Sequence, residues 1–151
     1  MANLEQRLAN HSMIGLDTSV FIYHFEAHPH YLPLTRVVLK QIESGQCMGV
    51  ISTVAIMELT VHPWRLNRAD IARQYEALLV NFPNLKLGDV SREVARRAAQ
   101  LRAKYNLRPA DALQVGTAMV EGATLWVSNN KGLKRIEPEL EVIILDEYVG
   151  P

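Results

Sequence analysis

Residues 13–19 read MIGLDTS, a short apolar run that ends in an acid followed by two hydroxyl residues. With residues 12–16 as a first strand, similar runs rich in Val, Ile and Leu follow at residues 48–52, 85–87, 124–128 and 142–145. Strands that are covered on both faces carry such unalternated apolar runs. Because longer amphipathic stretches separate the runs, the sequence predicts an α/β fold, a three-layer sandwich with a central, mostly parallel sheet.

The amphipathic stretches predict helices over residues 32–44, 53–61, 67–80, 91–105 and 109–122. Pro63 is expected to stop the second of these helices, because proline lacks the N–H that a helix interior needs. Asn67 and Ser91 are expected to cap the third and fourth helices. Pro109 is well placed as a first helical residue, and Gly122 as a stop.

Size and composition favour one ordinary globular unit. The 151 residues suit a single domain over residues 1–151, with residues 1–11 as a short N-terminal extension. Sixteen basic residues balance sixteen acidic ones, so the net charge gives no support to a strongly nucleic-acid-binding protein. The single cysteine, Cys47, cannot form an internal disulfide. No apolar run approaches the ~20 residues of a membrane span, and we expect a soluble cytoplasmic protein.

Three acids stand where an α/β fold would aim them at one crevice. Asp17 directly follows the first strand, Glu58 lies in the helix after the second strand, and Asp111 lies in the first turn after Pro109. Ligands of open parallel sheets bind outside the carboxyl ends of the strands. Two carboxylates at ~4 Å repel by roughly 4 kcal/mol at the effective dielectric of a protein surface. Three of them together therefore call for a cation, and Mg²⁺ and Mn²⁺ prefer oxygen ligands.

Three further residues fit the same chemistry. Asn130 follows the fourth strand and offers a neutral oxygen, and Thr18 and Ser19 offer hydroxyls at a helix start, which favours an anion such as phosphate. The set as a whole predicts metal-assisted hydrolysis of phosphodiester bonds.

Each of the four principal residues also has a plainer interpretation. Asp17 could be only a helix cap, and Asp111 could only complement a helix dipole. Glu58 could form a salt bridge with an arginine, and Asn130 could be a turn residue.

Basic residues are unevenly distributed. One group contains Arg92, Arg96, Arg97, Arg102, Lys104 and Arg108, and a smaller one contains Lys131, Lys134 and Arg135. Each group is either an ordinary solvated surface or a guide for a nucleic-acid backbone.

Three segments resemble motifs of a known family. Residues 14–22, IGLDTSVFI, look like the opening of PIN-domain ribonucleases, and residues 52–59, STVAIMEL, look like their second motif. Residues 109–118, PADALQVGTA, are similar to the third motif and are the most specific of the three. Their order and spacing, and the length of the chain, resemble the VapC-type toxins of toxin–antitoxin pairs.

The resemblance implies a Mg²⁺- or Mn²⁺-dependent endoribonuclease with Asp17, Glu58 and Asp111 as the metal-site residues and Thr18 or Ser19 as a supporting hydroxyl. It also implies a homodimer and an antitoxin partner whose tail occupies the cleft. The fourth motif of the family usually reads Thr-Asn-Asp, whereas this chain ends the motif with Asn130. We expect this loss of one negative charge to reduce or retune the activity.

Two alternatives remain at this point. One is a catalytically weakened PIN-like module that binds RNA or a protein, for which Asn130 is the main support. The other is a receiver-like phosphoacceptor domain with Asp17 in an acidic pocket, which the order of the motifs disfavours.

Overall fold

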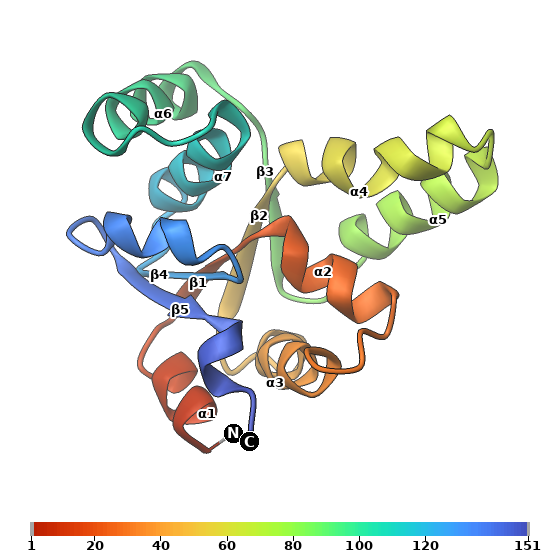
Figure 1. The fold of residues 1–151 in the computed structure, drawn as a ribbon, viewed down its shortest axis with the longest axis horizontal. Helices are drawn as coiled ribbons and strands as arrows, with labels where there is room; N and C mark the ends of the chain where they lie inside the picture. Colours follow the sequence, from red (N-terminus) through yellow and green to blue (C-terminus); the bar gives the residue numbers. More distant parts are fainter. Residues whose placement is uncertain (1, 151) are drawn as a thin grey trace.

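The computed structural model describes residues 2–150, which are built around a five-stranded parallel sheet of order β3-β2-β1-β4-β5 (Figure 1). The strands are β1 Met13–Leu16, β2 Met48–Ser52, β3 Leu85–Gly88, β4 Leu125–Ser128 and β5 Glu141–Ile144. Every predicted strand is present, and no predicted end is displaced by more than one residue. The α/β sandwich that the apolar runs predict is therefore confirmed.

Helices cover both faces of the sheet (Figure 1). The α-helices are α1 Ala2–Ala9, α2 Thr18–Phe25, α3 Leu32–Glu43, α4 Val54–Arg65, α5 Ala69–Val80, α6 Arg92–Tyr105 and α7 Pro109–Val120, and the 3₁₀ helices are η1 Lys131–Ile136 and η2 Leu145–Tyr148. One face packs against α1, α2 and α3 and the other against α6 and α7, while α4 and α5 form a pair beside the sheet. Within residues 2–150, none of these helices has the length and apolar character that a bilayer span requires.

Two predicted helix boundaries are wrong. Helix α4 continues through Pro63 to Arg65, although the proline cannot donate to the carbonyl of Leu59 four residues earlier. Leu66 N–H then closes the last turn on His62 and Pro63 carbonyls. Asn67 does not cap α5: it adopts a left-handed conformation (φ 56°), which turns the chain between the two helices. Asparagine tolerates this conformation better than most residues do.

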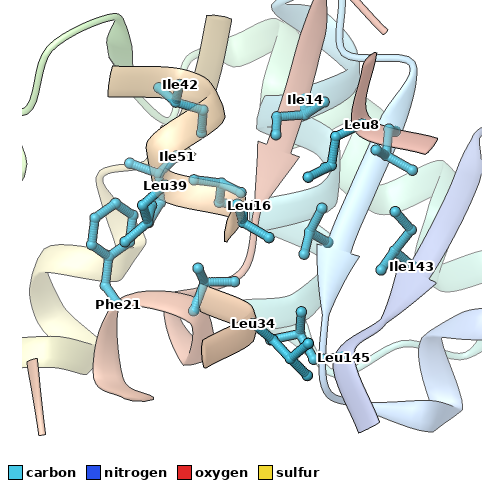
Figure 2. Packing of buried hydrophobic residues seen from close by; sticks show 14 of the residues in the cluster. Leu8, Ile14, Leu16, Phe21, Leu34, Leu39, Ile42, Ile51, Ile143 and Leu145 are labelled. Atoms are coloured by element: carbon cyan, nitrogen blue, oxygen red, sulfur yellow. The ribbon is translucent and has the colours of Figure 1, made fainter. Parts of the chain in front are cut away.

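Other boundaries agree with the sequence. Ser91 caps α6 by accepting a hydrogen bond from Val94 N–H at 3.1 Å, and Pro109 opens α7. The N-terminal extension is a helix whose Leu4 and Leu8 are fully buried. Figure 2 shows Leu8 beside Ile14 of β1 and Ile143 of β5, so this segment contributes to the core on one face of the sheet.

A close contact between β1 and α7 fixes how these two elements lie relative to each other. A Cβ on Gly15 would lie 2.5 Å from Ala118 Cβ and 2.9 Å from Trp126 Cε3, so only glycine allows α7 to approach the strand. The chain order also reverses between β1 and β4. Strands β2 and β3 extend the sheet on one side of β1, whereas β4 and β5 extend it on the other side. Such a reversal opens a crevice at the carboxyl ends of the two strands.

Candidate active site

The carboxyl edge of the sheet carries a cleft of about 420 Å³. All six residues that the sequence analysis singles out line it: Asp17, Thr18, Ser19, Glu58, Asp111 and Asn130. They follow the ends of β1 and β4 or lie in the first turns of α2 and α7, and Glu58 lies in the second turn of α4. The topology therefore brings together residues that lie up to 113 positions apart in the sequence, as the separation of Asp17 and Asn130 shows (130 − 17).

Asp17 is both a helix cap and a wall of the cleft. Its Oδ1 accepts a hydrogen bond from Ser19 N–H at 3.2 Å, and its Oδ2 accepts one from Ser128 Oγ at 2.6 Å. Burial raises the pKa of Asp17 above its ordinary value, although these two hydrogen bonds oppose the shift. The charges of Asp111 and Glu58 make smaller contributions in the same direction as burial.

Glu58 is held by hydroxyl and amide donors, and among the described residues it has no arginine partner. Its Oε1 accepts hydrogen bonds from Thr18 Oγ1 at 2.8 Å and from Gln114 Nε2. Gln114 Oε1 accepts in turn from Thr18 N–H at 3.3 Å. Because Gln114 is only 2 % exposed, these contacts join α2, α4 and α7 through one buried amide. The carboxylate is thereby fixed with its second oxygen, Oε2, free of protein donors within residues 2–150.

Asp111 is paired with an arginine from its own helix start. Arg108 Nε donates to Asp111 Oδ2 at 3.1 Å, and the Asp111 side chain is only 11 % exposed. The hydrogen bond to Asp111 raises the pKa of Arg108, and the charges of Glu58 and Asp17 add to the effect.

Asn130 lines the cleft but also has a local structural role. Its Oδ1 accepts from Gly132 N–H at 3.0 Å and so caps η1, as the turn interpretation of this residue requires. Its own N–H donates to Ser128 Oγ at 3.0 Å, and this serine also donates to Asp17. Ser128 thus links the fourth motif to the first acid. An amide oxygen has two lone pairs, so Asn130 Oδ1 retains one acceptor site.

The side-chain oxygens of the cleft suit a hard divalent cation, although they are not already arranged around a metal position. Among residues 2–150, no three His, Cys, Asp or Glu side chains are already gathered as metal ligands. Each of the three acids instead accepts hydrogen bonds from protein donors, which reduce the repulsion between the carboxylates. Carboxylate oxygens remain available in the cleft, whereas Ser19, which also lines it, keeps its Oγ buried without a hydrogen-bond partner within the same part of the chain. These acceptor-rich surroundings match the oxygen ligands of Mg²⁺ and Mn²⁺.

Two residues of the site have roles that the sequence analysis missed. Gln114 follows Asp111 by three positions, which places both on one side of α7. A glutamine between Ala112 and Val115, both fully buried, was the signal that could have identified it. Arg108 was grouped with the other basic residues, whereas it is the member that lines the cleft.

Several other basic residues have local partners. Lys104 pairs with Glu139 at 3.2 Å, and Arg102 Nε donates to the carbonyl of Leu107. In the smaller basic group, Lys131 pairs with Asp146 at 3.0 Å and Lys134 pairs with Glu147. These pairs fit an ordinary solvated surface better than a prepared nucleic-acid path.

Comparison with solved structures shows the same fold in toxin–antitoxin complexes. A chain of VapBC2 from Rickettsia felis bound to a DNA fragment from its promoter has a TM-score of 0.65 at 20% identity, with 87% of this chain and 98% of that chain covered. A toxin–antitoxin complex from Klebsiella pneumoniae gives 0.64 at 20% identity, covering 89% and 98%. VapBC-1 from nontypeable Haemophilus influenzae gives 0.65 at 15% identity, covering 89% and 98%. No curated protein matches the sequence significantly.

The sequence itself matches one family across most of its length. Residues 14–138 match the PIN domain, and this range contains β1 with Asp17, α4 with Glu58, α7 with Asp111, and Asn130 after β4. The fold, the position of the cleft and the matched range agree with one another, and this chain belongs to the PIN domain family.

Proposed function

We propose that this protein is a divalent-metal-dependent endoribonuclease, the VapC-like toxin of a toxin–antitoxin pair. The single observation that supports it best is that Asp17, Glu58 and Asp111, from three separate elements, line one cleft at the carboxyl edge of the sheet. PIN domains are generally nucleases, and the solved structures of similar fold are toxin–antitoxin complexes.

Each acid has a defined role in the proposal. Asp17 and Asp111 would hold a divalent ion directly or through water, and Glu58 would orient one of its waters through Oε2. The bound Mg²⁺ or Mn²⁺ would lower the pKa of a water and offset charge on the phosphate. Thr18 and Ser128 keep Glu58 and Asp17 in place, and the backbone N–H of Ser19 donates to Asp17 as well.

The antitoxin partner has a suitable surface beside the cleft. An apolar groove of about 300 Å³ lies between α2, α4 and α5, with Phe25, Leu59 and Tyr75 among its lining residues. Ile22 and Glu58 line both the groove and the cleft. We propose that an antitoxin segment binds in the groove and reaches the acids from there. The proposed setting is the cytoplasm, where the RNA substrate is found.

A homodimer is the second proposed assembly. Met57, Val61 and Trp64 lie on one side of α4 at spacings of four and three residues, and their exposed fractions are 59%, 39% and 51%. Such an apolar stripe is unusual for a monomer surface and fits contact with a second copy.

A module that has lost its chemistry is the competing candidate. The observation in its favour is Asn130, which supplies no negative charge and already accepts a hydrogen bond from Gly132 N–H. In that case the cleft would bind RNA without cutting it.

Cleavage of a fluorescent single-stranded RNA with Mn²⁺ or Mg²⁺ separates the two candidates, with chelator and a DNA of the same sequence as controls. Asp111→Asn is expected to reduce cleavage by at least about 100-fold, because the ion loses a charged ligand. Glu121→Gln is the matched control, since Glu121 pairs with Lys86 just past the opposite end of α7. Equal cleavage by Asp111→Asn and Glu121→Gln would refute the nuclease proposal. RNA binding without cleavage by the wild-type protein would favour the module.

A further inference from the structure

Arg108 is the only cationic residue among the described residues that line the cleft, which contains three acids. It stands at the residue before α7, with an extended backbone (φ −64°, ψ 150°) that is typical of a residue before proline. Its guanidinium reaches Asp111 three residues later, at 3.1 Å from Nε to Oδ2. The cleft therefore contains one internal counterion for three negative charges.

This counterion is loosely held. The Arg108 side chain is 77 % exposed, and within residues 2–150 its guanidinium makes this one hydrogen bond out of five possible donors. Arg7 illustrates the contrast: its guanidinium donates to Tyr148, to Glu141 and to the carbonyl of Val142. An exposed pair of the Arg108 kind contributes little to stability, so Arg108 can leave Asp111 at low cost.

The position of the guanidinium has a second consequence. RNA that enters the cleft must place a phosphate beside the three acids, within reach of Arg108. A guanidinium binds phosphate oxygens through a planar pair of donors, and does so better than an ammonium group. The same side chain can therefore neutralise a carboxylate in one state and bind substrate in another.

We propose that Arg108 is an exchangeable counterion: it neutralises Asp111 in the empty cleft, releases it to an incoming divalent cation, and then binds a phosphate of the RNA. The inference rests on the nuclease proposed above and adds a role for a residue outside the acid set. It makes two predictions of opposite sign for one substitution. Removing the positive charge strengthens metal binding and weakens substrate binding.

The first measurement is Mn²⁺ affinity by titration calorimetry in the absence of RNA. Arg108→Gln is expected to bind Mn²⁺ roughly three- to ten-fold more tightly than the wild type, because a like charge beside the ion is gone. The gain should shrink as salt increases, since exposed charges are screened. Lys86→Gln is the matched control: it also removes one exposed positive charge and one ion pair with an acid, Glu121, which follows Asp111 by ten residues, about 15 Å along the axis of α7.

The second measurement is the KM for a short fluorescent RNA at saturating Mn²⁺. Arg108→Gln is expected to raise KM about five- to ten-fold, whereas Lys86→Gln leaves it unchanged. Arg108→Lys keeps the charge but loses the planar pair of donors, so its Mn²⁺ affinity should stay near the wild-type value while KM still rises. Circular dichroism checks that each variant is folded.

The outcomes separate this inference from the function on which it rests. A wild-type protein that binds no Mn²⁺ overturns both. If the wild type binds Mn²⁺ and Arg108→Gln binds it equally or more weakly, the counterion role is wrong and Arg108 only supports Asp111. Tighter Mn²⁺ binding with an unchanged KM overturns the contact with RNA.

Discussion

The two edges of the sheet carry similar residues in opposite electrostatic arrangements. At the amino edge, Glu141 is within 3.1 Å of Arg7 and 3.2 Å of His11, and His11 also contacts Thr124 at 2.7 Å. The acid there has two cationic or potentially cationic partners. At the carboxyl edge, three acids share the cleft with one exposed arginine.

The two edges differ in whether the surroundings of their carboxylates favour the charged form. Burial raises the pKa of Glu141, but the hydrogen bonds from His11 and Arg7 outweigh it and hold the pKa below its ordinary value. Burial raises the pKa of Asp17, and its hydrogen bonds do not compensate. The carboxylate that is unfavourable lies at the carboxyl edge, which supports that edge as the site of the proposed function.

Among substitutions that test the contrast between the two edges, Gln114→Leu is expected to change Mn²⁺ affinity most. Loss of the amide donor leaves Glu58 Oε1 with Thr18 as its single donor and loosens the carboxylate, so Mn²⁺ affinity should fall by about ten-fold or more. Thr117→Val is the control, because Thr117 is equally buried on α7 but donates to the carbonyl of Leu113 within its own helix. If calorimetry gives the two variants the same Mn²⁺ affinity, Gln114 does not position Glu58.

A smaller effect is expected when a fourth acid is added to the functional edge. Asn130→Asp can still accept from Gly132 N–H and so preserve the cap of η1. The added charge should tighten Mn²⁺ binding by about five-fold. Asn10→Asp introduces the same charge in the exposed turn before β1, at the amino edge, and should leave the affinity unchanged. A loss of affinity in Asn130→Asp would show that this residue faces away from the ion.

The amino edge should respond in stability alone. Glu141→Gln weakens the contacts with Arg7 and His11 and should lower the free energy of unfolding by about 1 kcal/mol or less, since these groups are partly exposed. For a chain of this size, this is a fall of about 2–4 °C in Tm at most. RNA cleavage should not change. A loss of cleavage without a loss of stability would remove the distinction between the edges.

The smallest effect is a difference in pH dependence without metal. The lowered pKa of Glu141 gives stability that is present above its unfolded-state pKa and is lost as pH falls through its folded-state pKa. The raised pKa of Asp17 gives stability that is present below its unfolded-state pKa and is lost as pH rises through its folded-state pKa.

Urea unfolding at several pH values tests these signs. Near neutral pH, Asp17→Asn should be more stable than the wild type by less than about 1 kcal/mol, and Glu141→Gln less stable by a similar amount. Both differences should vanish in acid. If both variants change the free energy of unfolding in the same direction at neutral pH, the contrast between the edges is wrong. Asparagine keeps the acceptor for Ser19 N–H and so the cap on α2, although its amide nitrogen cannot accept from Ser128 Oγ.

The strands and the cleft could be predicted from the sequence for a physical reason. Strands covered on both faces are short, apolar and bounded by polar residues, and the residues that follow parallel strands meet at one edge. Asp17, Glu58 and Asp111 are found together on that basis.

Features that depend on tertiary partners could not be predicted. Gln114 acts on Glu58 from 56 positions away, and no local pattern indicates that contact. Helix α4 includes Pro63 and two residues beyond it, and the left-handed turn at Asn67 sets where the next helix begins. The order of the strands, which places β4 beside β1, likewise becomes known only in the folded chain.

Gly15 gives the site a hidden sensitivity. The missing side chain lets α7 rest on β1, so the separation between Asp17 on one element and Asp111 on the other is set by a residue with no functional group. A single methyl group there would wedge the helix outward and spread the acids apart while every polar residue stayed intact. A substitution at Gly15 would thus abolish the proposed activity of a protein that keeps all of its motif acids.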